Sequence, residues 1–208
     1  MPKENYITAS CVIAEQAIFK NNQQIFENKA ANVESFLAAV YQNFNINYPK
    51  FYKMDNLSKL GWLAAEVLLA NGFEKEKYEP QDIALIIANK NSSLDTDIKY
   101  FETVKTIASP ALFVYTLPNI VMGEICIRNN FKGENAFFIF ERFNPGFMQQ
   151  YVQHLFDTDA TKAVICGWIE TMNNDYKAAL YLVENGMQAK AVPFTVENIN
   201  HIYQITNG

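Results

Sequence analysis

The sequence predicts an α/β fold with a mostly parallel central sheet of about five strands covered by helices. Segments rich in β-branched and aromatic residues alternate with segments whose apolar residues have helical spacing, which is typical of strands followed by helices. The run from Asp82 to Asn89, DIALIIAN, is almost continuously apolar, as expected for a central strand covered on both faces. No repeat, low-complexity segment or linker divides the sequence. Residues 1–208 are therefore expected to form a single domain.

The elements follow in a clear order. Asn32 is a candidate cap for the first helix, the second begins near Asn56 and ends at Asn71-Gly72, and Asn185-Gly186 is a strong hairpin signal. The expected strands are 6–13, 82–89, 136–140, 161–170, 176–184 and 187–193. The expected helices are 32–44, the segment from Asn56 to Asn71-Gly72, 95–107, a short helix after Asn119, one opening at Pro145, and 194–205. The helix 95–107 has these apolar residues on one side: Ile98, Phe101, Val104 and Ile107.

Composition excludes several classes of function. Of the 208 residues, 50% are hydrophobic, and the net charge is −5, so a folded chain without a nucleic-acid-binding face is expected. The N-terminus lacks a basic segment followed by an apolar run, and no stretch approaches the length of a membrane span. We expect a cytoplasmic protein with no nucleic-acid or membrane partner.

The cysteines and histidines predict no metal site. Cys11, Cys126 and Cys166 are odd in number, contain no CxxC spacing and sit among apolar neighbours, which favours small buried side chains over a disulfide framework or zinc site. His154 and His201 are far apart in the sequence, too few for a histidine-rich site. No cofactor or metal is expected.

The segment from Ser109 to Gly146 has the organisation of an active site. It predicts a loop, a short helix, a glycine turn and one very apolar strand, followed at once by a helix that opens at Pro145. Unpaired backbone N–H groups converge where a strand turns into a helix N-terminus, and many α/β folds place a nucleophile or an anion there.

This segment resembles the β-ketoacyl-acyl-carrier-protein synthases of the thiolase superfamily. In that family a Ser-Pro is followed by the pattern N-x-x-x-G-x-x-x-I, a glycine turn, and a strand that ends at a nucleophilic cysteine. The matching positions here are Ser109-Pro110, Asn119, Gly123, Ile127 and Gly133. Further matches are Met54-Asp55 before the second helix, and Gly167 with Glu170 in the strand 161–170. The resemblance implies a thiolase-like half.

The resemblance puts Arg142 at the position of the cysteine. A guanidinium stays protonated and cannot attack a thioester, and the neighbouring residues, Phe-Glu-Arg-Phe-Asn-Pro-Gly, include no serine or cysteine. No catalytic residue is therefore assigned. We predict a vestigial site formed by Glu141, Arg142, Phe143, Asn119 and Thr116. On a structural interpretation, Glu141 and Arg142 form a salt bridge or reach solvent. On a functional one, Arg142 fills the vestigial acyl site or binds an anion such as the phosphopantetheine phosphate of an acyl-carrier protein.

The strand 136–140 is a candidate dimer strand. The resemblance implies dimerisation by pairing this strand with its mate across a two-fold axis, and an unpaired apolar edge strand is an aggregation hazard. We therefore expect a homodimer or a heterodimer with a full-length ketoacyl synthase. Chain-length factors provide the family precedent, because they pair with active synthases although their own cysteine is replaced. The residues of this strand are Ala136, Phe137, Phe138, Ile139 and Phe140.

The resemblance runs from Tyr6 to Glu184 and covers only the first half of a synthase. In a full synthase the helix behind the cysteine lies between two similar halves and is apolar on nearly every side. The helix that opens at Pro145 instead combines an apolar stripe with Gln149, Gln150, Gln153 and His154, which predicts a side that meets water or a polar interface.

Three functions remain open from the sequence. The first is a catalytically inactive half-length synthase-like protein that serves fatty-acid or polyketide-type biosynthesis as an accessory or acyl-carrier-binding subunit. The second is an acyltransferase, a 3-oxoacyl-acyl-carrier-protein synthase completed by a separate C-terminal chain that supplies the histidines. The third is a small-molecule binding module that uses a cleft at Arg142. Fold resemblance alone does not decide among them.

Overall fold

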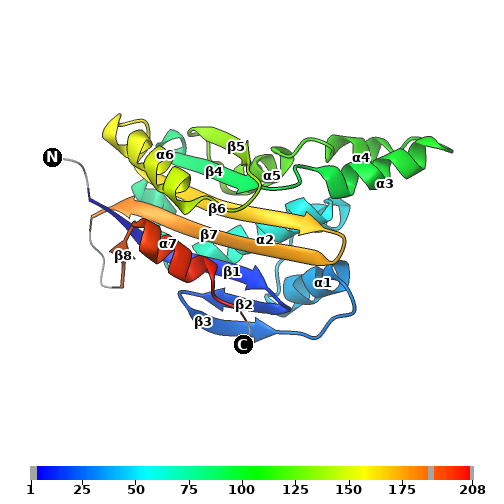
Figure 1. Ribbon diagram of the computed structural model, residues 1–208, viewed down its shortest axis with the longest axis horizontal. Coiled ribbons are helices and arrows are strands. Elements are labelled where there is room, and N and C mark those ends of the chain that lie inside the picture. Colours follow the sequence, from blue (N-terminus) through cyan, green and yellow to red (C-terminus); the bar gives the residue numbers. More distant parts are fainter. Residues whose placement is uncertain (1–3, 187–189, 207–208) are drawn as a thin grey trace.

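The computed structural model describes residues 4–186 and 190–206. Figure 1 shows a central sheet with helices on both of its faces. The strands are β1 (Asn5–Ala14), β2 (Ala17–Lys20), β3 (Gln23–Glu27), β4 (Ile83–Asn89), β5 (Asn135–Ile139), β6 (Ala163–Met172), β7 (Asp175–Asn185) and β8 (Val192–Pro193). The helices are α1 (Val33–Asn43), α2 (Asn56–Leu69), α3 (Leu94–Val104), α4 (Pro110–Val114), α5 (Ile120–Asn129), α6 (Pro145–Asp157) and α7 (Val196–Tyr203). Short 3₁₀ turns are Pro49–Lys53, Lys75–Lys77 and Pro80–Asp82.

The sheet is mixed, so the expectation of a mostly parallel sheet of about five strands is wrong. In the described part of the chain, eight strands follow the order β3-β2-β1-β7-β6-β4-β5, with β8 paired to β1. β4 is parallel to β5 and β6, and the other described pairs are antiparallel. The links β2–β3 and β6–β7 are too short for a parallel crossover. Asn21, Asn22 and Asn173 take left-handed backbone angles in these tight turns, with φ of 49°, 65° and 56°.

Several expected elements are confirmed. β1, β4 and β6 lie within a few residues of their expected positions, and α7 lies within the expected helix 194–205. The Asn32 side chain accepts a hydrogen bond from the backbone N–H of Ser35 at 2.8 Å and caps α1. The cap of α2 is Asp55, one residue before the expected Asn56, and its carboxylate accepts from the backbone N–H of Ser58 at 2.9 Å.

The expected hairpin across Asn185-Gly186 does not form in the described residues. β8 pairs with the start of β1, where Val192 lies opposite Ile7, and β7 pairs with β1 and β6. Residues 187–189 of the expected strand lie outside the described residues. The segment expected to pair with β7 instead forms β8, which pairs with β1 on the edge that does not face β7.

The sheet separates two hydrophobic cores. On one face, α1, α2 and α5 cover a core that includes the fully buried Trp62 and Phe36. On the other face, α6 and α7 cover a core around Tyr181 and Phe156. The Tyr181 hydroxyl donates to the Ile199 carbonyl of α7 at 2.9 Å, which fixes this helix on the sheet. Both faces are thus closed by helices of the chain itself.

Two glycines of the synthase-like motifs allow close approach of backbone segments. Gly167 in β6 has φ of +148°, and a Cβ atom there would lie 2.0 Å from the Ala179 carbonyl oxygen of β7. Gly133 precedes β5, and a Cβ atom there would lie 2.3 Å from the Ile83 carbonyl oxygen. A side chain at either position would push neighbouring strands apart.

The helices α3 and α4 extend beyond the ends of the strands, at the upper right of Figure 1. The chain continues into α5 and β5, which lie along the upper side of the molecule in that view together with α6. None of the helices in residues 4–186 and 190–206 has the length and apolar character needed to cross a membrane.

Candidate functional site

The carboxyl ends of the parallel strands meet at one edge of the sheet. β4 ends at Asn89, which is paired with Ile139 near the end of β5. The Phe140 backbone N–H donates to the Asn89 carbonyl at 2.9 Å, and α6 opens at Pro145, a few residues later. In α/β sheets, ligands bind outside the carboxyl ends of strands, where helix N-termini favour anions. This edge is therefore the candidate functional site.

The loop after β4 is held by side-chain hydrogen bonds. The buried Asn89 side chain donates to the Ser92 carbonyl at 2.8 Å and accepts from the Ser92 N–H at 2.9 Å. Glu170 of β6 accepts from the backbone N–H groups of Lys90 at 2.7 Å and Asn91 at 3.0 Å, and from the Asn91 side chain at 2.9 Å. A carboxylate of the neighbouring strand thus fixes this turn.

Thr116 and Asn119 lie in the connection between α4 and α5. The Ser93 hydroxyl, at the end of the loop after β4, donates to the Thr116 carbonyl at 2.7 Å. The Thr116 hydroxyl donates to the Phe113 carbonyl at 2.7 Å, so it closes the end of α4. Asn119 is exposed at the start of α5, and its side chain makes no capping bond there. Thr116 therefore borders the site loop through its backbone, whereas no hydrogen bond in the described residues links Asn119 to the other predicted site residues.

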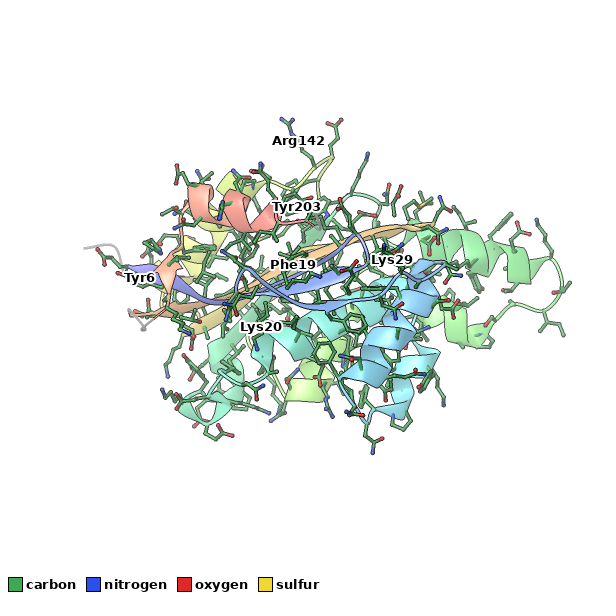
Figure 2. All side chains as sticks on the ribbon, turned by 90° about the horizontal axis from the view of Figure 1, so that it is seen from below. Tyr6, Phe19, Lys20, Lys29, Arg142 and Tyr203 are labelled. Atoms are coloured by element: carbon green, nitrogen blue, oxygen red, sulfur yellow. The ribbon has the colours of Figure 1, made fainter. Side chains whose placement is uncertain are left out.

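Glu141 and Arg142 are exposed in the loop before α6. Within residues 4–186 and 190–206, no hydrogen bond or ion pair reaches either side chain. Figure 2 shows Arg142 extending away from the body of the protein. The loop lines a polar hollow of about 370 Å³ that runs from Phe140 to Pro145. Both side chains therefore reach solvent, and neither forms a salt bridge within the described residues.

The inner side of the same loop is filled by aromatic rings. Phe143 is buried and stacks on Tyr203 of α7, with ring centroids 4.5 Å apart. It also packs edge-on against Trp168 of β6 at 5.9 Å. The Lys177 ammonium lies 4.3 Å from the Tyr203 ring centroid, and burial lowers the pKa of Lys177. Sequence reasoning missed Tyr203, although the expected helix 194–205 contains it.

None of the three cysteines lies in the loop before α6, because Cys11 is in β1, Cys126 in α5 and Cys166 in β6. Cys11 and Cys166 are fully buried, and burial raises the pKa of Cys11 to about 12. Burial likewise raises the pKa of Cys126 to about 11. A thiol with so high a pKa stays neutral and unreactive near pH 7.

β5 is an edge strand. It pairs with β4 on one side, and no described strand pairs with its other side. The Glu134 carbonyl and the Phe140 N–H both bond β4. Because backbone groups alternate along a strand, the N–H and C=O groups of Phe137 and Ile139 point toward the free edge. The expected dimer strand thus presents unpaired backbone groups.

The side chains of β5 are apolar on both faces. Phe138 packs against Phe147 and Tyr151 of α6, with ring centroids 4.8 and 5.1 Å apart. Phe140 packs against Phe147 at 4.9 Å. Ile139, on the opposite face, is 51% exposed. These rings are only partly covered, so β5 and α6 together offer an aromatic surface beside the free edge.

Exposed apolar side chains are concentrated in the segment from α3 to β5. Ten of the thirteen exposed large hydrophobic side chains in the described residues lie between positions 94 and 139, on α3, α4, α5 and β5 or in their connections. We name this set the apolar rim: Leu94, Ile98, Phe101, Val104, Ile107, Phe113, Val114, Leu117, Ile127 and Ile139. Exposed patches of this kind mark interaction surfaces.

The fold is the thiolase-like fold of ketosynthases and chain length factors. Over 91% of its length the chain matches the structure described as the ishigamide ketosynthase/chain length factor, with a TM-score of 0.64 and 14% identity. It matches a ketosynthase in complex with its chain length factor from Xenorhabdus doucetiae over 96% of its length (TM-score 0.59, 11% identity, 90% of that chain covered). A β-ketoacyl synthase from Burkholderia phymatum STM815 matches over 88% (TM-score 0.59, 10% identity, 59% of that chain covered).

The chain spans 64% of the length of the ishigamide protein. No protein-family model matches the sequence, and no curated protein matches it. The similarity to the solved structures therefore concerns the fold.

Proposed function

We propose that the chain is a single, catalytically inactive domain resembling the N-terminal half of a ketoacyl synthase, and that it acts as a partner subunit in fatty-acid or polyketide-type biosynthesis. The observation that carries the proposal is the unpaired β5 edge flanked by the apolar rim. Pairing of β5 with the β5 of a second thiolase-like subunit would satisfy the exposed backbone groups and bury the rim.

The chemistry of the loop before α6 supports an inactive role. Arg142 takes the place that the resemblance assigns to the nucleophile, and a guanidinium cannot form a thioester. Phe143 and Tyr203 stack on each other with ring centroids 4.5 Å apart, so aromatic side chains fill the inner side of this loop. The three cysteine thiols have raised pKa values and lie on β1, α5 and β6 rather than in this loop.

The covered face of the sheet favours this role over an enzyme completed by a separate C-terminal chain. In a full synthase, the helix behind the nucleophile contacts the second half. Here α6 buries Met148 and Val152 against the sheet while Gln150 and His154 face outward. The adjacent surface is occupied by α7, whose Ile199 and Ile202 are buried. A second half would have to displace α7.

A carrier protein is a further candidate partner at the loop before α6. Arg142 is exposed, and the hollow beside it is polar. A guanidinium binds phosphate through paired hydrogen bonds, so Arg142 would meet the phosphopantetheine phosphate of a docked acyl-carrier protein. One solved structure of this fold is described as an acyl-carrier protein in complex with its ketosynthase.

Size-exclusion chromatography with light scattering tests the proposal. The chain is run alone and mixed with the ketosynthase and the acyl-carrier protein of its own organism. We expect a homodimer or a defined complex, and we expect Ile139→Asp to abolish it because the carboxylate would be buried at the joint. Val192→Asp is the matched control, since Val192 is 38% exposed on β8, away from the rim. A wild-type monomer in every mixture, or assembly by Ile139→Asp, would contradict the proposal.

A further inference from the structure

A cavity of about 500 Å³ lies between the β2–β3 hairpin and the C-terminal end of α2. It is far from the loop before α6, because β2 and β3 form the opposite edge of the sheet from β5. Five apolar side chains line it: Ile25, Phe44, Ile46, Val67 and Ala70. Cavities of this volume suit a small apolar ligand.

The cavity wall carries two charged side chains, Glu66 and Lys20, and they differ in whether an opposite charge pairs with them. The Glu66 carboxylate is paired with Arg128, whose Nε and Nη2 atoms each lie 3.2 Å from a carboxylate oxygen. Lys20 donates to the Ala70 carbonyl at the end of α2. That bond uses one of the three ammonium donors, and in the described ranges no carboxylate pairs with Lys20. Burial lowers the pKa of Lys20, a cost that an anion beside it would offset.

A smaller cavity of about 200 Å³ adjoins the first and shares Lys20 and Ile25 with it. Its other lining residues are Asn21, Gln23 and Lys190. Two lysines and two residues with side-chain amides thus line an open hollow next to the apolar cavity. Figure 2 shows Lys20 on the side of the hairpin opposite Phe19, toward the face covered by α1 and α2. In a chain of net charge −5, this local excess of positive charge selects for an anion.

We propose that the two cavities form one binding site for a single-chain amphiphile that carries a carboxylate. The alkyl chain lies in the larger cavity against Ile46 and Val67, and the carboxylate lies between Lys20 and Lys190. The site is independent of the proposed dimer, since it lies on the β2–β3 hairpin and α2 and contains no residue of the apolar rim.

Isothermal titration calorimetry with octanoate, decanoate and 1-decanol tests the site, using the full chain. Each buried methylene contributes about 0.8 kcal/mol, so decanoate should bind about fifteenfold more tightly than octanoate. Decanoate should also bind at least about tenfold more tightly than 1-decanol, because an ammonium–carboxylate bond is stronger than one to a hydroxyl.

Three variants separate the charge from the cavity. Lys20→Met should weaken decanoate binding about tenfold or more and leave 1-decanol binding unchanged. Ile46→Trp should weaken both ligands because the indole fills the apolar chamber. Lys177→Met is the matched control, since Lys177 is another half-buried lysine with a lowered pKa but lies over Tyr203 on the opposite face, and it should bind like wild type.

Equal affinity of wild type for decanoate and 1-decanol would overturn the proposal. So would the absence of decanoate binding, or a Lys177→Met variant that loses as much affinity as Lys20→Met. Circular dichroism of each variant shows that it is folded before titration.

Discussion

Glu170 is predicted to stabilise the loop that joins β4 to α3. Its carboxylate accepts three hydrogen bonds of 2.7 to 3.0 Å, two from backbone N–H groups and one from the Asn91 side chain. Hydrogen bonds to a charged group contribute about 1.5–3 kcal/mol each, but the exposed donors regain water when the carboxylate is removed. We therefore expect Glu170→Ala to lower the free energy of unfolding by about 3 kcal/mol. Glu170→Gln should cost about 1 kcal/mol, because its NH₂ group can turn toward the Asn91 side chain while its oxygen still accepts from the backbone.

Thermal unfolding followed by circular dichroism measures these changes. For a chain of this size, 1 kcal/mol corresponds to about 2–4 °C, so Glu170→Ala should lower Tm by about 6–12 °C and Glu170→Gln by about 2–4 °C. Glu102→Ala is the control, since Glu102 is exposed and, among the described residues, pairs with Lys105 alone, a contact that contributes at most about 0.5 kcal/mol. If Glu170→Ala melts within about 2 °C of Glu102→Ala, the reasoning about this loop is refuted.

Three further changes test the fold. Gly167→Ala should lower the free energy of unfolding by about 4 kcal/mol or more and leave little soluble protein, because the Cβ would lie 2.0 Å from the Ala179 carbonyl oxygen. Gly72→Ala is the control: a Cβ there would have nothing within 4 Å, so this variant should express and melt like wild type. Burial holds the pKa of Asp55 above its ordinary value of 3.8, so the folded state binds more protons than the unfolded state, and the contribution of Asp55 to stability is lost as the pH rises above that value. Asp55→Asn removes this loss, and urea unfolding should show the variant gaining stability relative to wild type from about pH 4 to about pH 7; a constant difference across that range would contradict the assignment. Tyr181→Phe should lower the free energy of urea unfolding by about 1–3 kcal/mol, since the buried Ile199 carbonyl loses its donor, and an unchanged midpoint would show that the bond does not hold α7.

Local sequence signals predicted the elements that are long and strongly patterned. β4 is buried at every position, as its continuous apolar run indicated, and Asn32 caps α1 as expected. The sequence predicts a site at the loop before α6 because strand, turn and helix start follow one another within a few residues. The amphipathic pattern expected for α6 is present, because Gln150 and His154 are exposed and Met148 is buried.

These local signals did not predict which strands pair with each other or in which direction. The strands β2 and β3 are short, and their segment has little β-branched character, so the turn at Asn21-Asn22 was the one cue to them. The alternation of strands and helices predicted parallel strands. It gave no sign that β6 and β7, which are joined by two residues, form an antiparallel pair. The apolar residues of α3 were expected on one side of a helix, and that side is open: Phe101 is 65% exposed and Ile107, just beyond the helix, is 85% exposed. An apolar helix side that the chain leaves uncovered is itself an argument for a partner.

Hydrogen exchange of the β5 backbone, resolved by residue in solution NMR, tests the central claim most directly. The N–H groups of Phe137 and Ile139 point to the free edge, whereas Phe140 N–H bonds the Asn89 carbonyl within the chain. If β5 pairs with a second subunit, Phe137 and Ile139 will exchange slowly, and their protection will rise with protein concentration or on addition of the ketosynthase. If both exchange as fast as the N–H groups of an exposed strand at every concentration and in the presence of the ketosynthase, β5 is not an interface and the proposed role is wrong.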